Sequence, residues 1–100
     1  MRRFLLAISA LLMVSACEPS EFAVAKNEIA KDLRDPDSVQ FRNVRMSSKE
    51  ENYVCLEYNA KNAFGAYVGY KSAAVFVTSD AVFRFHGASE FPALFNKYCG

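Results

Sequence analysis

The side chains that could act as a nucleophile or as a soft metal ligand are few: Cys17, Cys55, Cys99 and His86. A catalytic serine needs a base within reach, and no nucleophile-elbow motif surrounds Ser72 or Ser89. One histidine without a Cys-x-x-Cys pair does not make a typical zinc site. The sequence therefore predicts no enzyme, no cofactor and no metal. A hydrolase acting through Cys55 or His86 is the catalytic alternative.

The hydrophobic residues are concentrated at the N-terminus. They make up 52% of the 100 residues, and 12 of them fall within residues 1–16. Two arginines follow Met1, and the next 11 residues, Phe4 to Val14, carry no charge. As a helix this run would span about 16 Å, which is too short for the bilayer's hydrocarbon core of about 30 Å. Small residues then precede Cys17, so we predict that residues 1–16 are a cleaved signal peptide.

The last residues of this segment, Val14-Ser-Ala-Cys17, resemble the bacterial lipobox. In that class of signal the cysteine thiol receives a diacylglycerol, a peptidase cuts before the cysteine, and the new amino group is acylated, for example with palmitate. The resemblance implies a lipid on Cys17, a short tether over residues 17–21, and the membrane as a partner. Glu18 is not the aspartate that keeps some lipoproteins in the inner membrane, which favours the periplasmic side of the outer membrane. The alternative is an ordinary secretory peptide that is cut elsewhere.

The charge of the exported part excludes one class of partner. Lys and Arg number 12, so removal of Arg2 and Arg3 leaves ten basic residues against 11 Asp and Glu. Nucleic-acid-binding domains usually carry a strong basic excess. We therefore expect no nucleic-acid partner.

Two cysteines, Cys55 and Cys99, remain once Cys17 carries its lipid. An exported domain lies in an oxidising compartment, where two such thiols usually pair. They lie 44 residues apart in the sequence, and a crosslink over that distance contributes roughly 3–4 kcal/mol in the chain-entropy account. We predict a structural disulfide, with two buried free thiols as the alternative.

The spacing of apolar residues predicts a helix at each end of residues 22–100, which we expect to form a single domain. The first helix runs from Phe22 to about Arg34 and ends before the Asp35-Pro36 pair. The second follows a cap at Ser89 and buries a stripe of four residues: Phe91, Leu94, Phe95 and Tyr98.

Four strands are predicted between the helices, over residues 39–46, 53–58, 67–78 and 81–85. The alternation of the first strand breaks near Arg42-Asn43, and Gly65 should take a positive φ in the turn between the second and third strands. Short turns favour an antiparallel meander of three to four strands, with both helices packed on the same face. The predicted class is α+β.

Tyrosines gather around the two central strands and suggest a binding face. Its candidate residues are Tyr58, Asn59, Lys61, Asn62, Tyr67 and Tyr70. One interpretation is that the tyrosines only cap a face of the sheet through cross-strand pairs. The other is an interface, where exposed tyrosines are favoured.

Two stretches, Leu33 to Val44 and Val54 to Lys71, carry an Asp-Pro-x-Ser-x-x-Phe-Arg-Asn motif and a Val-Cys-x-x-x-Asn-x-Lys-Asn motif. Together they resemble a family of small uncharacterised proteins of bacteria and their phages. Leu56 stands where the family commonly has glycine. The resemblance brings no activity. It implies that Phe41 belongs to the core and that Asn59, Lys61 and Asn62 shape a turn or offer polar contacts.

These features together predict a membrane-anchored envelope lipoprotein whose small domain binds another envelope protein. The alternative is a periplasmic module that binds a small ligand or a glycan in a pocket among Phe64, Tyr67 and Tyr70.

Overall fold

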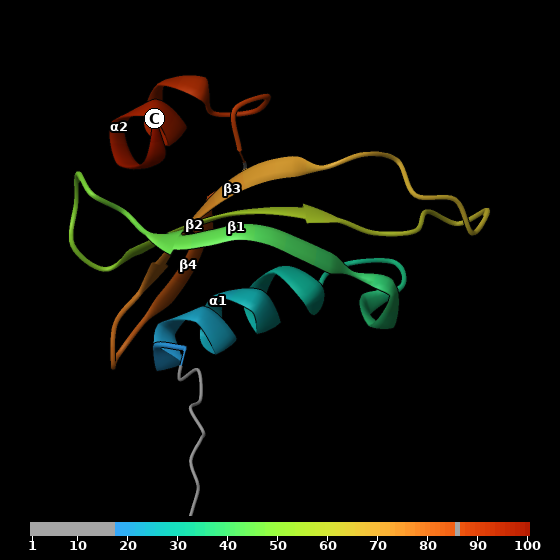
Figure 1. The fold of residues 1–100 in the computed structure, drawn as a ribbon, viewed down its shortest axis with the longest axis horizontal. Helices are drawn as coiled ribbons and strands as arrows, with labels where there is room; N and C mark the ends of the chain where they lie inside the picture. The colour runs from blue at the N-terminus through green and yellow to red at the C-terminus, as the bar shows by residue number, and fades with distance from the viewer. Residues whose placement is uncertain (1–17, 86) are drawn as a thin grey trace, which may run out of the picture.

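The computed structural model describes residues 18–85 and 87–100. The predicted signal peptide, Cys17 and His86 lie outside these described residues. The described chain is an α+β domain built on a four-stranded antiparallel sheet in the order β1-β2-β3-β4 (Figure 1). Its elements are α1 (Ser20–Ala30), a short 3-10 helix η1 (Pro36–Ser38), β1 (Gln40–Met46), β2 (Tyr53–Asn59), β3 (Lys71–Val77), β4 (Val82–Phe85) and α2 (Pro92–Cys99). The predicted meander is confirmed.

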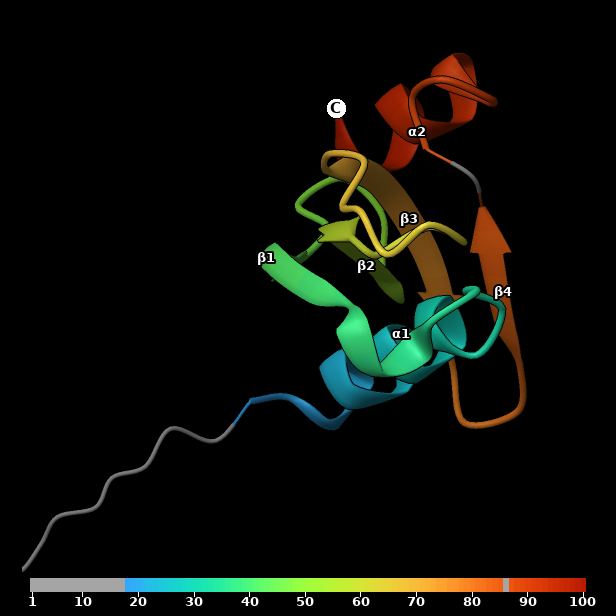
Figure 2. The same ribbon diagram turned by 90° about the vertical axis from the view of Figure 1, so that its right-hand side faces the viewer.

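The two helices pack on opposite faces of the sheet, so the prediction of a shared face is wrong (Figures 1 and 2). Val54 and Leu56 point toward α1, whereas Tyr53 and Cys55 point toward α2. All four are buried, because a strand covered on both faces is apolar at consecutive positions. Each helix covers one of these two faces.

Helix α1 is shorter at its C-terminal end than the apolar spacing predicts. It stops at Ala30 rather than near Arg34, and the amide of Leu33 donates to the carbonyl of Ala30 at 3.0 Å in a turn. Leu33 still packs against the core beside Ile29. Leu33 therefore reaches the core from a turn, although its spacing from Ile29 had predicted a further helical turn. At the other end the helix begins at Ser20, inside the predicted tether.

The predicted break in the first strand is confirmed as an irregularity of β1. The register with β2 shifts between Arg42 and Arg45, and Asn43 has a φ of 54°. The extra residue lets Phe41 and Val44 both pack toward α1. It also bends an edge strand that carries exposed arginines, and both features discourage edge-to-edge pairing.

A disulfide between Cys55 and Cys99, as predicted, attaches α2 to the centre of the sheet. Beside it the rings of Tyr53 and Tyr98 stack with centroids 4.0 Å apart. Burial, with a hydrogen bond to Tyr98, raises the pKa of Tyr53 to about 12. Arg45 Nη2 donates to the Cys99 carbonyl at 3.0 Å, and the Ser47 hydroxyl donates to the Tyr98 carbonyl.

Two further predicted boundaries differ from the structure by several residues. The third strand begins at Lys71 rather than Tyr67, so residues 60–70 form a long β2–β3 loop. Helix α2 has Phe91 as N-cap and Pro92 in its first turn, in place of a cap at Ser89. Phe91 is 44% exposed and does not join the buried stripe.

Candidate functional site

The β2–β3 loop, residues 60–70, is an ordered turn that projects from one end of the sheet (Figure 1). The side-chain Oδ1 of Asn62 accepts hydrogen bonds from the amides of Phe64 at 2.9 Å and Ala66 at 3.2 Å. The Gly65 amide donates to the Asn62 carbonyl at 3.0 Å. Gly65 has the predicted positive φ, 78°, which favours glycine. One asparagine thus fixes the backbone on both sides of Phe64.

The base of the loop is attached to neighbouring segments. The Tyr67 hydroxyl donates to the Ser38 carbonyl at 2.8 Å, and the Lys61 amide donates to the Ser38 hydroxyl at 3.0 Å. The Gly69 amide donates to Oδ1 of the buried Asn59 at 3.1 Å. Figure 1 shows the loop and the segment between α1 and β1 at the same end of the molecule.

This ordered loop holds apolar side chains in solvent. Phe64 is 93% exposed, Val68 56% and Tyr67 42%. We call these three residues the loop tip. A phenylalanine exposed on a fixed turn is unusual for a residue type that is normally buried, and such patches often mark interaction sites.

The structure brings only part of the six-residue predicted binding face together: Tyr58, Lys61 and Asn62 line one pocket. Asn59 and Asn62 form the internal hydrogen bonds of the loop, which agrees with the turn-shaping role that the resemblance implied. Tyr58 is half-buried on the α1 side of the sheet. Tyr70 lies under the guanidinium of Arg42, 3.7 Å from its ring centroid.

Arg42 also holds a carboxylate on the face opposite α1. Its Nε lies 2.6 Å from Oε1 of Glu57, and the Asn43 amide donates to the same oxygen at 2.9 Å. The hydrogen bond from Arg42 is the largest cause that lowers the pKa of the Glu57 carboxyl below its ordinary value. Arg42, Asn43 and Glu57, the polar residues of this network beside Tyr70, thus bind one another.

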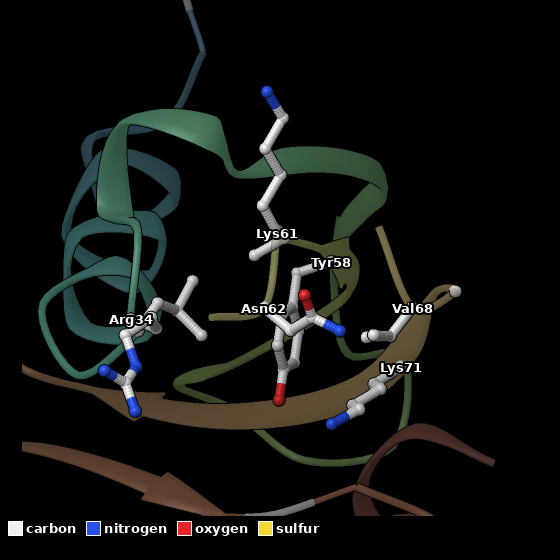
Figure 3. A pocket seen from close by; sticks show the side chains of 9 residues that line it. Arg34, Tyr58, Lys61, Asn62, Val68 and Lys71 are labelled. Atoms are coloured by element: carbon white, nitrogen blue, oxygen red, sulfur yellow. The ribbon is translucent and has the colours of Figure 1, made fainter. Parts of the chain in front are cut away.

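A pocket of about 170 Å³ lies between the end of α1 and the base of the loop (Figure 3). Three basic residues line it, Arg34, Lys61 and Lys71, together with the ring of Tyr58. Its apolar walls are Leu33, Ala60 and Val68. Arg34, Lys71 and Val68 were not predicted to come together, because Arg34 and Lys71 lie 37 positions apart in the sequence. Phe64 was predicted only as part of the alternative ligand pocket, although its position between Asn62 and Gly65 indicated a turn apex.

The loop lies at the opposite end of α1 from the N-terminus of the described chain. Ser20, the first residue of α1, lines a different pocket with Asn52 and Thr78. Leu33 and Arg34, just beyond the last turn of α1, line the pocket at the loop. The helix therefore separates the N-terminal attachment point from the loop tip.

Of the two catalytic candidates considered from the sequence, the structure describes Cys55, whereas His86 lies outside the described residues. Cys55 is fully buried and disulfide-bonded, so its thiol is not available as a nucleophile. Within residues 18–85 and 87–100, no group of three or more potential ligands is placed to hold a metal ion.

Comparison with known proteins identifies the N-terminal segment. Residues 1–17 match the prokaryotic membrane lipoprotein lipid attachment site, and the match ends at Cys17. This supports a membrane-anchored lipoprotein of the cell envelope. No curated protein and no solved structure matches the chain. In the part of the chain that the structure describes, neither helix is both long and apolar enough to cross a bilayer.

Proposed function

We propose that the domain binds another envelope protein through the loop tip and that it does so without catalysis. The observation that carries this proposal is the 93% exposure of Phe64 on a turn fixed by Asn62. Aromatic residues supply a large share of binding energy at protein interfaces. A loop whose backbone is held by internal hydrogen bonds loses little conformational entropy on binding.

The position of the tip supports a protein partner rather than the bilayer that holds the lipid. Only Glu18 and Pro19 separate Cys17 from the first residue of α1. That end of the domain therefore lies close to the lipid. The loop tip projects from the opposite end, beyond a helix of 11 residues, or about 16 Å. We place the domain on the periplasmic side of the outer membrane, because Glu18 follows the lipidated cysteine.

The proposal is tested by photo-crosslinking in intact cells. A photoreactive phenylalanine analogue replaces Phe64, and the tagged lipoprotein is purified and its adducts identified by mass spectrometry. The matched control carries the same analogue at Phe91, another exposed aromatic, at the N-cap of α2. We expect one reproducible protein adduct at position 64 that is absent at position 91.

A second measurement tests the energy of the contact. Once the partner is purified, Phe64→Ala should raise its Kd at least about tenfold. Tyr67→Ala should weaken binding less, because Tyr67 is 42% exposed and Phe64 is 93% exposed. Adducts with lipid alone, equal capture at positions 64 and 91, or an unchanged Kd after Phe64→Ala would each refute the proposed surface.

A further inference from the structure

The pocket beside the loop has a charge that differs from the rest of the domain. Basic and acidic residues are nearly balanced over the whole chain, 12 against 11. The pocket is nevertheless lined by Arg34, Lys61 and Lys71 and by no acidic residue. These three come from the turn after α1, the start of the loop and the start of β3. The fold thus gathers positive charge at this place from three separate segments.

Two of these cations and a hydroxyl point to the same side of the pocket. Figure 3 shows the Arg34 guanidinium, the Tyr58 hydroxyl and the Lys71 ammonium on that side, while Lys61 extends away from them. The Lys61 ammonium lies 5.7 Å from the centroid of the Tyr67 ring. The three ion pairs among the described residues are Lys26–Glu18, Lys31–Glu28 and Arg42–Glu57. Arg34 and Lys71 take part in none of these three pairs.

The size and walls of the pocket limit what it can hold. Its volume of about 170 Å³ equals that of about six water molecules, which is below the range of sites for drug-sized ligands. Leu33, Ala60 and Val68 form apolar walls next to the charged groups. The space fits a charged head with a few carbon atoms.

We infer that this pocket binds a small oxyanion, a phosphate or a carboxylate, carried on a short apolar group. Arg34 and Lys71 donate charge-assisted hydrogen bonds to the oxyanion. The apolar walls contact its carbon atoms. The same chemistry occurs on lipid headgroups and on soluble phosphate esters. The pocket shares Val68 with the loop tip, but Phe64, which carries the proposed protein contact, does not line the pocket.

The test is a titration of the lipidated protein in neutral detergent with n-butyl phosphate, followed by NMR. We expect saturable shifts at the pocket residues with a Kd on the order of millimolar, as for other fragments of this size. Arg34→Gln and Lys71→Gln should each raise the Kd at least about fivefold. Lys61→Gln is the matched control, because Lys61 lines the same pocket while its ammonium points away. It should change the Kd less than about twofold.

Three results would overturn the inference: no saturable binding, equal binding of 1-butanol, or an equal effect of Lys61→Gln and Lys71→Gln. The last would indicate diffuse attraction to a basic surface. Displacement of butyl phosphate by dihexanoyl phosphatidate would support the site as one for lipid headgroups, and failure to displace would support soluble esters. Phe64→Ala should leave the Kd unchanged, so this site and the loop tip succeed or fail separately.

Discussion

The disulfide gives the prediction with the best-defined magnitude. The double substitution Cys55→Ala and Cys99→Ala opens a loop of 44 residues. The chain-entropy relation assigns such a loop about 4 kcal/mol at 25 °C. The Tyr53–Tyr98 stack and the hydrogen bond from Arg45 to the Cys99 carbonyl remain. We therefore expect α2 to stay docked in the variant while the free energy of unfolding falls by about 4 kcal/mol.

Urea denaturation of residues 18–100 measures this loss. Far-UV circular dichroism reports the sheet, and tyrosine fluorescence reports the packing of Tyr53 and Tyr98, since the chain has no tryptophan. The parent protein with added reductant should unfold at the same midpoint as the double variant. Small domains have about 5–15 kcal/mol in total, so the variant should be marginally stable.

A loss below about 1 kcal/mol would refute this reasoning. It would mean that the denatured chain already keeps its C-terminus near β2, or that non-covalent contacts of α2 set the stability. A changed slope of the denaturation curve would distinguish these cases, because a more compact denatured state exposes less surface and lowers that slope.

Three further substitutions test local features. Arg42 lowers the pKa of Glu57, so the ionised carboxylate stabilises the folded protein. This stabilisation is complete above the ordinary pKa of 4.5 and is lost as the pH falls through the lower folded-state pKa. Glu57→Gln should therefore flatten the pH dependence of the urea midpoint below pH 4.5. An added Cβ at Gly87 would overlap the Ser72 carbonyl oxygen, so Gly87→Ala should cost about 3 kcal/mol in the same urea assay. Asn62→Ala removes two hydrogen bonds worth about 1 kcal/mol each, and hydrogen exchange of the loop amides should accelerate accordingly.

Local signals in the sequence were sufficient for the strand order and for several turns. The break at Arg42-Asn43 and the positive φ of Gly65 both follow from residues adjacent in the chain. Short polar turns between strands lead to antiparallel neighbours, and the structure has that meander. These features depend on backbone preferences that act over a few residues.

The face on which α2 packs could have been predicted by combining the disulfide with the alternation of side chains in β2. If Cys99 bonds to Cys55, the helix must lie on the face to which Cys55 points. Val54 and Leu56 point the other way, toward α1, because side chains alternate along a strand. The disulfide prediction thus already implied two faces. The prediction that both helices pack on the same face was therefore inconsistent with the predicted disulfide.

The alternation of side chains along a strand also divides the predicted binding face, of which Tyr58, Lys61 and Asn62 line one pocket. Tyr58 and Asn59 are consecutive residues of β2, so their side chains point to opposite sides of the sheet. Tyrosines that are close in sequence need not share a surface. The basic pocket was beyond prediction from spacing alone, because Arg34 and Lys71 meet only when the end of α1 packs near the start of β3.

Ser38 connects the two proposed sites. Its hydroxyl donates to the Asp35 carbonyl at 2.7 Å and accepts from the Lys61 amide at 3.0 Å, while its carbonyl accepts from the Tyr67 hydroxyl at 2.8 Å. The segment after α1, which supplies Arg34 to the pocket, is thereby joined to the loop that carries Phe64. Replacement of Ser38 by alanine would remove the hydroxyl contacts of both segments and should destabilise both, whereas Phe64→Ala or Lys71→Gln affects one. The loop tip and the pocket are therefore separable in their chemistry but share a support.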